Sequence, residues 1–314
     1  MYNSDGYQET LSKVKVIDFM ELTTGWISIR QIRQEMRVVT KEGAAKLRTY
    51  LSRMCTTENG EHPFLERNDK QDGLYRRLEL DRKPVDLTRK EATYWDLKWP
   101  FGLEDVVRIP TKGIIILAGE KDAGKTAFLS NFVALNMNKH VIDYWTSEII
   151  GDDITERYYA IDPSLPDPLP FNAWERYANY ADVIEPDHIN VIDYLDTNSD
   201  YILVADEINK IFEKLDKGIA VIAMQKPLPS VTYIKGQKKV IQRDMAYGGT
   251  PTAKRACLYL SLSQGHIKIV FVKKRANPRI DPRNMQWTFN IDEKGANFLN
   301  IKQGALPEID NQLI

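Results

Sequence analysis

Cysteine is scarce in this chain of 314 residues, and long apolar runs are missing from it. Cys55 and Cys257 are the only cysteines, which argues against a disulfide framework and for a reducing compartment. No stretch approaches the roughly 18 to 20 apolar residues that a membrane-spanning helix needs. The N-terminal residues MYNSDGYQET lack the basic start and the apolar segment of a signal peptide. We therefore expect a soluble, cytoplasmic protein with no membrane partner.

Histidine clusters and an excess of one charge are also missing. His62, His140, His188 and His266 are scattered without the spacing of metal ligands, which argues against a zinc site. The formal net charge is −1, so any basic surface for nucleic acid must be local. Hydrophobic residues at 43% and charged residues at 28% are ordinary values, which exclude disordered and collagen-like classes.

The first eighty or so residues differ in pattern from the rest. A first helix is predicted by apolar residues at near-helical spacing, namely Leu11, Val14, Ile17 and Met20. Ser28 and Thr40 are good N-caps and predict two further helices that begin there. The last of these would bury Ala44, Leu47, Leu51 and Met54. Two short extended runs around Asp72-Gly73 then predict a hairpin. This outline is typical of a winged helix-turn-helix, which we assign to residues 1–82, with a linker over 83–98.

Basic residues occupy the predicted DNA-contacting positions of this small α+β domain. In a winged helix the third helix enters the major groove and the hairpin lies on the phosphate backbone. The predicted third helix carries Lys41, Lys46, Arg48 and Arg53, and the hairpin carries Arg67, Lys70, Arg76 and Arg77. We expect DNA contact through the four helix cations and Arg76. The alternative is a solvated face used for protein contacts, because the segment as a whole is close to neutral.

Residues 99–314 alternate short apolar runs with helical ones. GIIILAG, HVIDYW, HINVIDYL and IAVIAM are separated by helical segments, and CLYLSLS, HIKIVFV and MQWTFNI follow. This order predicts an α/β domain whose mostly parallel sheet is covered on both faces, with later strands forming a mixed edge.

GEKDAGKT, residues 119–126, matches the P-loop pattern between a predicted strand and a predicted helix. Gly119 and Gly124 would let backbone N–H groups wrap the phosphates, and the helix start adds partial positive charge. Lys125 would reach the β- and γ-phosphates, and the Thr126 hydroxyl would bind Mg²⁺. The expected nucleotide-binding residues are Gly119, Glu120, Lys121, Asp122, Ala123, Gly124, Lys125, Thr126 and Ala127. The alternative is an ordinary glycine-containing turn.

Three further polar residues end apolar runs in this region. Asp193 is expected to bind Mg²⁺, with Asp196 as a competitor and capping of the next helix as the alternative. Glu148 would point at the γ-phosphate from the strand after the P-loop helix, although an acid there also suits a helix start. Gln225 ends another core strand and is followed directly by a loop.

This constellation resembles the RecA-like ATPases, and in particular the replicative-helicase branch typified by DnaB, over roughly residues 95–295. The resemblance implies ATP hydrolysis with Glu148 as catalytic base and Asp193 as Mg²⁺-binding acid. It also implies that Gln225 senses the γ-phosphate and relays its state to a DNA-binding loop.

A second part of the resemblance lies in IKIVFVKKRANP. It is similar to the helicase stretch in which a Lys and an Arg reach into the neighbouring subunit's ATP site, here Lys273 and Arg275. Two such cations would neutralise transition-state charge on a nucleotide of another subunit. The alternative is a solvated basic strand end that includes Lys274.

The stretch after Gln225 has the composition of a DNA-contacting loop. Its cations are Lys226, Lys235, Lys238, Lys239 and Arg243, against the single acid Asp244. We expect backbone contact with DNA through Lys235, Lys238, Lys239 and Arg243 inside an oligomer. A mere insertion is the alternative, although loops of this length are usually functional or disordered.

The family's helical N-terminal domain is replaced here by the predicted winged helix, which places replicative fork unwinding in doubt. We therefore expect an oligomeric ATPase, a ring or a filament, that acts on single- or double-stranded DNA as a helicase, translocase or recombinase-like protein. An ATP-gated regulator or assembly protein without unwinding activity is the alternative.

Overall fold

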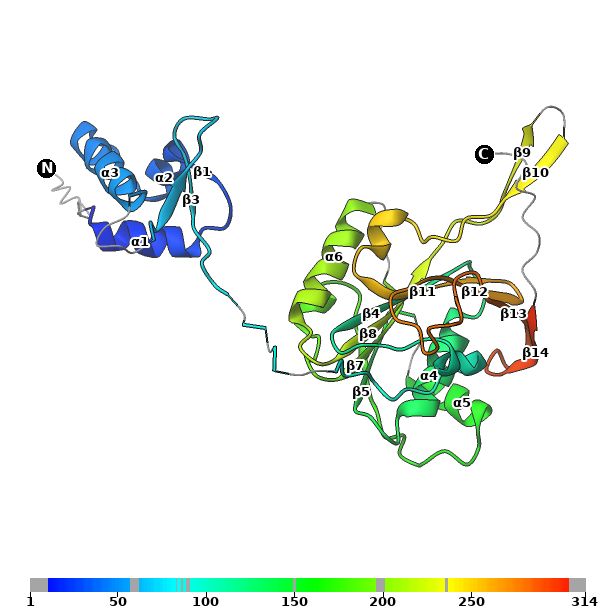
Figure 1. Ribbon diagram of the computed structural model, residues 1–314. Coiled ribbons are helices and arrows are strands. Elements are labelled where there is room, and N and C mark those ends of the chain that lie inside the picture. Colours follow the sequence, from blue (N-terminus) through cyan, green and yellow to red (C-terminus); the bar gives the residue numbers. More distant parts are fainter. Residues whose placement is uncertain are drawn as a thin grey trace, which may run out of the picture. The chain divides into compact units, whose positions relative to one another are not determined.

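The computed structural model describes residues 11–56, 62–82, 84–85, 87–88, 91–148, 151–195, 201–234 and 237–304. The chain divides into two compact units, residues 1–88 and 89–314, and the division falls inside the stretch predicted as a linker (Figure 1). Over the described ranges, no helix has the length and apolar character needed to cross a bilayer.

The helices of the N-terminal unit begin at polar caps. They are α1 (Lys13–Leu22), α2 (Ile29–Glu35) and α3 (Lys41–Met54). Ser28 forms a capping box with Gln31, and the Thr40 hydroxyl accepts from the backbone N–H of Gly43, as both predicted caps require. The predicted stripe of the first helix is displaced, because Val14 is 65% exposed while Val16 is fully buried.

A small antiparallel sheet completes this unit. Its strands β1 (Ile27–Ser28), β2 (Leu65–Arg67) and β3 (Leu74–Arg77) lie in the order β1-β3-β2. The turn between β2 and β3 contains Gly73 at φ +75°, a conformation that favours glycine. The predicted hairpin is therefore confirmed, and it packs on a core of Val16, Met20, Ile32, Leu47, Leu51, Met54, Leu65 and Tyr75.

One large sheet, which we call the main sheet, organises the C-terminal unit. Its described strands follow the order β14-β13-β12-β11-β4-β8-β7-β5-β6. Their bounds are β4 (Gly113–Gly119), β5 (Ile142–Thr146), β6 (Asn172–Glu175), β7 (Ile189–Asp193), β8 (Ile219–Gln225), β11 (Ala256–Ser263), β12 (His266–Val272), β13 (Gln286–Ile291) and β14 (Phe298–Gly304). Pairing is parallel from β11 through β4 to β6 and antiparallel from β11 to β14. The predicted α/β fold with a mixed edge is thus confirmed.

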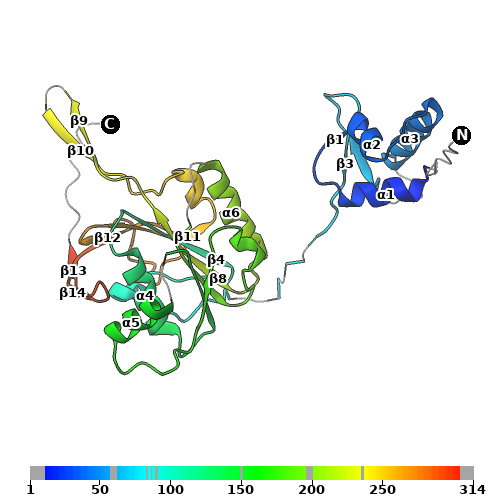
Figure 2. The ribbon, with the colours of Figure 1, turned by 180° about the vertical axis from the view of Figure 1, so that it is seen from behind.

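Helices cover both faces of the main sheet. Helices α4 (Lys125–Asn136) and α5 (Gly151–Ile161) pack on one face, and α6 (Tyr201–Lys214) packs on the other (Figure 2). In β4, Ile115 and Leu117 face α4 while Ile114 and Ile116 face α6. This two-sided burial explains why the strand reads as a continuous apolar run. Short 3₁₀ turns over Pro100–Asp105, Tyr180–Asp182 and Thr250–Ala253 connect the elements.

The stretch predicted as a basic loop is a β-hairpin. Strands β9 (Ser230–Ile234) and β10 (Gln237–Ile241) pair antiparallel in a sheet of their own. In both views the hairpin extends away from the main sheet (Figures 1 and 2). The apolar residues Val231, Val240 and Ile241 suit a strand but lie exposed here. This exposure leaves the hairpin available for contacts outside its own unit.

Candidate functional site

The P-loop connects the end of β4 to the start of α4, as predicted. Asp122 and Gly124 adopt the left-handed conformation, with φ of +58° and +97°. A Cβ added to Gly119 would collide with the side chain of Lys125, and one added to Gly124 would lie 2.5 Å from Ile291 Cδ1. Gly124 is therefore favoured by its backbone angle as well as by local packing, whereas at Gly119 only the Lys125 side chain stands in the way.

Lys125 folds back over its own loop. Its Nζ donates to the Glu120 carbonyl at 3.0 Å and lies 5.8 Å from the centre of the Tyr194 ring. Burial lowers the pKa of Lys125, and the carboxylates of Asp193 and Glu148 act against this shift. The ammonium group is thus held beside the loop by a single backbone acceptor and by nearby negative charge.

One cavity of about 730 Å³ brings the main predicted residues together. Lys125, Thr126, Glu148 and Gln225 all line it, together with loop residues Lys121, Asp122 and Gly124 and the helix residue Ala127. Glu120 is buried instead, and Gly119 and Ala123 are buried in the core. The volume lies in the range of small-molecule sites. The P-loop pattern therefore borders a real cavity rather than a packed turn.

Asp193 ends β7, directly before the cavity residue Tyr194, and is 1% exposed. The Tyr144 hydroxyl donates to Asp193 Oδ2 at 2.6 Å, whereas Oδ1 is buried with no hydrogen-bond partner in the described part of the chain. Burial raises the pKa of Asp193, and the hydroxyls of Tyr144 and Thr126 act against the rise. A buried carboxylate oxygen with nothing to bond is a suitable ligand for a divalent cation.

Protein side chains alone form no metal cage here. In the described ranges, no three His, Cys, Asp or Glu side chains are grouped as metal ligands. Mg²⁺ typically takes one or two protein ligands and completes its octahedron with water and substrate phosphates. Asp193 and Thr126 fit that pattern. The competitor Asp196 lies outside the described residues.

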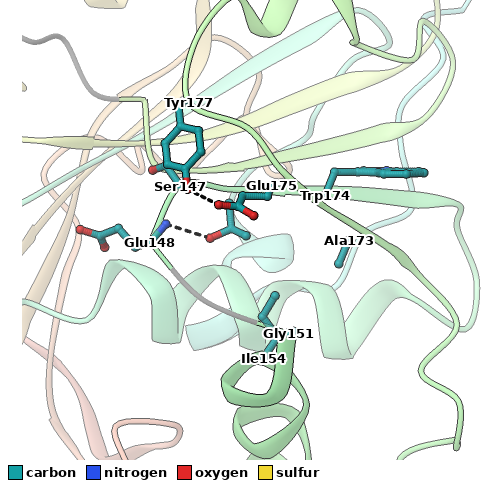
Figure 3. A pocket seen from close by; sticks show the side chains of 9 residues that line it. Ser147, Glu148, Gly151, Ile154, Ala173, Trp174, Glu175 and Tyr177 are labelled. Carbon is teal, nitrogen blue, oxygen red and sulfur yellow. Dashed lines mark hydrogen bonds between the residues drawn. The ribbon is translucent and has the colours of Figure 1, made fainter.

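Glu148 and Gln225 reach the cavity from the ends of two strands. Glu148 is exposed two residues beyond β5, and its N–H bonds to Thr146 Oγ1 at 3.3 Å. Glu148 also borders a smaller cavity of about 210 Å³ beside β6, lined by Trp174 and Tyr177 (Figure 3). Gln225 lies opposite Gly119 in the β4–β8 register. Parallel strands thus deliver both polar groups to the P-loop end of the sheet.

Arg157 and Tyr194 line the same cavity and were not predicted from the sequence. Arg157 lies on α5, where its Nη1 donates to the Gly295 carbonyl at 2.7 Å. Its Nε is buried without a hydrogen-bond partner among the described residues. The sequence contains no signal that Arg157 lines the cavity, because its position depends on how α5 packs beside the P-loop.

Lys273 and Arg275 do not line the cavity. Both are exposed, and Arg275 pairs with Asp281 at 3.2 Å. The backbone N–H of Lys273 bonds to Cys257 at the start of β11, whereas Gly119 lies opposite Leu262 near its end. At about 3.3 Å per residue, these cations lie on the order of 20 Å along the sheet from the P-loop of the same chain.

In the N-terminal unit the predicted DNA-binding residues differ in their availability. Lys41, Lys46, Arg48 and Arg53 are exposed on α3. Arg76 is paired with Glu66, and its guanidinium lies 5.3 Å from the centre of the Trp26 ring. Phosphate contact by Arg76 would therefore have to replace an existing ion pair.

The predicted cations after Gln225 also differ in their exposure to solvent. Arg243 is exposed beyond the end of β10. Lys238 and Lys239 lie on β10, where only their backbone is described, and Lys235 lies outside the described residues. Lys226, which the sequence groups with these cations, is 1% exposed and hence cannot contact a nucleic acid backbone from the surface.

No family model and no curated protein matches the chain. Among solved structures, the chain is similar to a KaiC-like protein from the hyperthermophilic archaeon Pyrococcus horikoshii OT3. The likeness has 13% sequence identity and a TM-score of 0.48, and it covers 68% of this chain and all of the other. The α/β fold and the phosphate loop are therefore assigned from the strand order and loop geometry of this chain.

Proposed function

We propose that this protein is a RecA-like ATPase of the DnaB type that works as an oligomer on DNA. The observation that supports this function best is the meeting of Lys125, Thr126, Glu148 and Gln225 around one cavity, next to the unpartnered oxygen of Asp193. A structural turn would not need three polar residues from separate strands to converge on it.

Each residue then has a role set by its position. The P-loop N–H groups and the start of α4 bind the phosphates, and Lys125 leaves the Glu120 carbonyl to reach them. Thr126 and Asp193 would hold Mg²⁺, and the bound ion would supply positive charge beside the transferred phosphoryl group. Glu148, exposed at the cavity, accepts the proton of the attacking water. Gln225 contacts the γ-phosphate end of the site.

Lys273 and Arg275 act on a neighbouring subunit. Their distance from the P-loop of their own chain, on the order of 20 Å along the strands, leaves only another copy's nucleotide within reach. A head-to-tail interface of this kind produces rings or filaments. Hydrolysis would then require assembly, and Arg275 would exchange Asp281 for phosphate oxygens.

The N-terminal unit serves as a winged helix for DNA. Its order of helices and its antiparallel hairpin support this interpretation, as do the exposed cations of α3. The β9–β10 hairpin, with Arg243 beyond it, supplies a second DNA contact from the ATPase unit.

Phosphate release measured with and without DNA tests this proposal. We expect DNA to stimulate turnover, Lys125→Ala to abolish nucleotide binding, and Arg275→Ala to abolish hydrolysis while nucleotide binding persists. Turnover by a strict monomer that is indifferent to DNA would contradict the proposal.

A regulator whose assembly is switched by ATP is the second candidate. The ion pairs of Arg67 with Asp72 and of Arg76 with Glu66 favour it, because they leave the hairpin fewer free charges for non-specific DNA. It predicts specific DNA or protein binding through Lys46 and Arg48 and slow turnover. A fluorescent-duplex unwinding assay with Lys125→Ala as control separates the two, since the regulator displaces no strand.

A further inference from the structure

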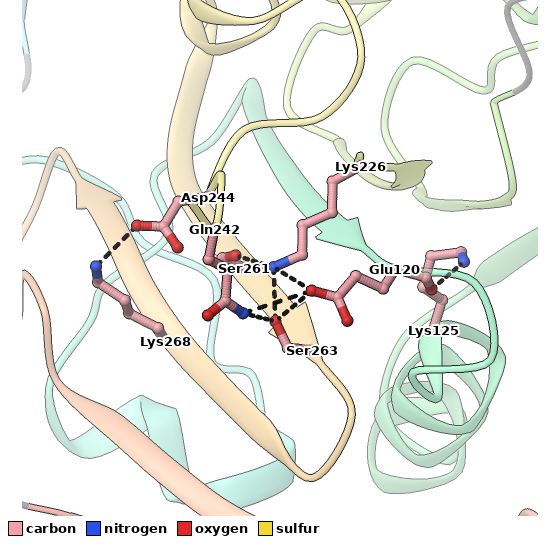
Figure 4. Close-up of polar contacts among 8 residues, drawn as sticks. All are labelled: Glu120, Lys125, Lys226, Gln242, Asp244, Ser261, Ser263 and Lys268. Carbon is pink, nitrogen blue, oxygen red and sulfur yellow. Dashed lines mark hydrogen bonds and ion pairs between the residues drawn. The ribbon is translucent and has the colours of Figure 1, made fainter. Parts of the chain in front are cut away.

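A polar cluster, buried except for Gln242 at its edge, lies beside the P-loop (Figure 4). Its members are Glu120, Lys226, Gln242, Ser261 and Ser263, and we call it the Glu120–Lys226 cluster. None of these residues lines the cavity with Lys125 and Glu148. The proposed ATPase mechanism uses none of their side chains.

The charges at its centre are removed from water and closely bonded. The Lys226 side chain is 1% exposed and that of Glu120 is 9% exposed, with 3.6 Å between Nζ and Oε1. Lys226 Nζ donates to Ser261 Oγ at 2.8 Å and to Ser263 Oγ at 2.7 Å. Ser263 in turn donates to Glu120 Oε1 at 2.9 Å. The ammonium group thus makes two hydrogen bonds and one longer ion pair.

Such a pair is a poor source of stability. Removing two charges from water costs about as much as their attraction returns, and apolar side chains of similar volume often serve a core as well. Burial also lowers the pKa of Lys226, which reflects the same cost. A fully bonded network does, however, fix its members in one arrangement. The main contribution of this cluster is therefore to hold its side chains in fixed positions.

The members of the cluster belong to the P-loop, to the segment after β8 and to the segment after β10. Glu120 belongs to the P-loop, and its carbonyl holds Lys125 at 3.0 Å. Lys226 directly follows Gln225, and its N–H bonds to the Gly119 carbonyl at 2.9 Å. Gln242 directly follows β10, and its Nε2 donates to Ser263 Oγ at 2.6 Å and lies 3.4 Å from Glu120 Oε1. The side chain of Glu120 thus links the phosphate loop to the base of the hairpin.

We propose that Lys226 is a positioning residue that fixes Glu120, and that the cluster couples the phosphate loop to the β9–β10 hairpin. When a nucleotide draws Lys125 away from the Glu120 carbonyl, Glu120 shifts against Ser263 and Gln242, and the hairpin base shifts with them. The proposal rests on nucleotide binding at the P-loop, and it requires neither DNA nor hydrolysis.

Hydrogen exchange of the full-length protein measures this coupling directly. In the wild type we expect a non-hydrolysable ATP analogue with Mg²⁺ to protect the P-loop and to change amide exchange in β9 and β10 by about threefold or more. In Lys226→Gln, which removes the buried ammonium group and leaves Glu120 in place, analogue binding and P-loop protection should persist while the hairpin response disappears.

Two further variants complete the test. Gln242→Ala leaves the buried pair intact and should also abolish the hairpin response, so the proposal is tested even if Lys226→Gln fails to fold. Lys268→Met removes an ion pair with Asp244, 2.8 Å long in the same region, without touching Glu120, and should respond like the wild type.

The outcomes separate this proposal from the proposed function. A wild type that binds no analogue would overturn both. Binding with P-loop protection but an unchanged hairpin would overturn the coupling alone, and so would a normal hairpin response in Gln242→Ala. Loss of the response in Lys268→Met would assign it to the general charge of the segment and would also overturn the coupling.

Discussion

Two buried carboxylates in neighbouring strands differ in how well they are bonded. Asp143, on β5, accepts from Asn172 at 2.9 Å and from Trp174 at 3.3 Å, and lies 2.7 Å from His188 Nδ1. Asp193, on β7, accepts from Tyr144 at 2.6 Å, but its Oδ1 is buried without a hydrogen-bond partner among the described residues. An unsatisfied buried group of this kind typically costs about 1–3 kcal/mol. Asp193 is therefore held at the expense of stability.

Asp193→Asn should raise the free energy of unfolding of the nucleotide-free protein at pH 7. The folded pKa of Asp193 is raised above its ordinary value of 3.8, so the folded carboxyl retains its proton longer than the unfolded one. The stabilisation that this carboxyl group provides is fully present below pH 3.8 and is lost as the pH rises through the folded pKa. Asparagine does not titrate, and each kcal/mol gained raises the melting temperature by about 2–4 °C.

Differential scanning calorimetry between pH 4 and 8 measures this effect, with Asp143→Asn as the matched control. The control should lower the melting temperature, because Asp143 is fully bonded. In the same Asp193 variant, Mg²⁺-dependent hydrolysis should fall by about a hundredfold or more. A destabilised Asp193→Asn variant with normal hydrolysis would contradict the assigned role.

Cys257 should be inert in the native protein. Burial raises the pKa of its thiol from 9.0 to about 12, so almost no thiolate exists at pH 8. In a Cys55→Ser variant, Ellman's reagent should label Cys257 only after unfolding in guanidinium. The free energy of unfolding should also fall between pH 9.0 and about 12, where only the unfolded thiol ionises. Rapid labelling of the native variant would contradict this placement.

Elements that bury both faces or one regular stripe are the ones that could be predicted from sequence. Strand β4 is buried at every position, and α3 buries one helical stripe, so both give strong patterns. Strand β6 is exposed at all four residues and β14 is exposed beyond its first residue, so neither has an apolar pattern. The β9–β10 hairpin was missed because its apolar residues lie outside any core.

The candidate site follows the same division. The strand-end positions of Glu148, Asp193 and Gln225 could be predicted because parallel strands place their carboxyl ends along one edge. Arg157 could not, since it depends on the packing of a helix rather than on a strand end. Lys226 was grouped with surface cations because a lysine in a basic segment is normally exposed, and only its serine and glutamate partners make burial tolerable.

Charge removal on α3 should weaken DNA binding in a salt-dependent way. Lys46 and Arg48 are exposed, so each alanine substitution should reduce the slope of log affinity against log salt by about 1 if the residue contacts a phosphate. Arg76→Ala should have less effect, because Arg76 is already paired with Glu66. Fluorescence anisotropy over a salt series provides the measurement, and equal slopes in all variants would favour a protein partner for this helix.

At the scale of the whole molecule, the proposed catalytic groups lie at two separated ends of one sheet. Lys125 and Glu148 gather at the carboxyl end of the parallel strands, whereas Lys273 and Arg275 lie at the opposite end. Under the proposed function, an active centre would therefore be assembled from two copies of the chain.

Mixing two inactive variants should restore hydrolysis. When Lys125→Ala and Arg275→Ala proteins assemble at random in equal amounts, about a quarter of head-to-tail interfaces combine an intact P-loop with an intact Arg275. We expect about that share of wild-type turnover per site, measured as phosphate release after subunit exchange. Mixing either variant with itself is the control, and a mixture as inactive as its components would argue against a shared site.

Gly124 of the P-loop and Asp193 would be conserved to different degrees if nucleotide binding were lost. Gly124 is fixed by its backbone angle and by the side chain of Ile291, so it would be retained even in a lineage that had stopped binding nucleotides. Asp193 keeps one buried oxygen without a hydrogen bond to any residue that the structure describes, which lowers stability, so such a lineage would lose it early. In related sequences, conservation of this aspartate would therefore be better evidence of nucleotide binding than conservation of the glycine.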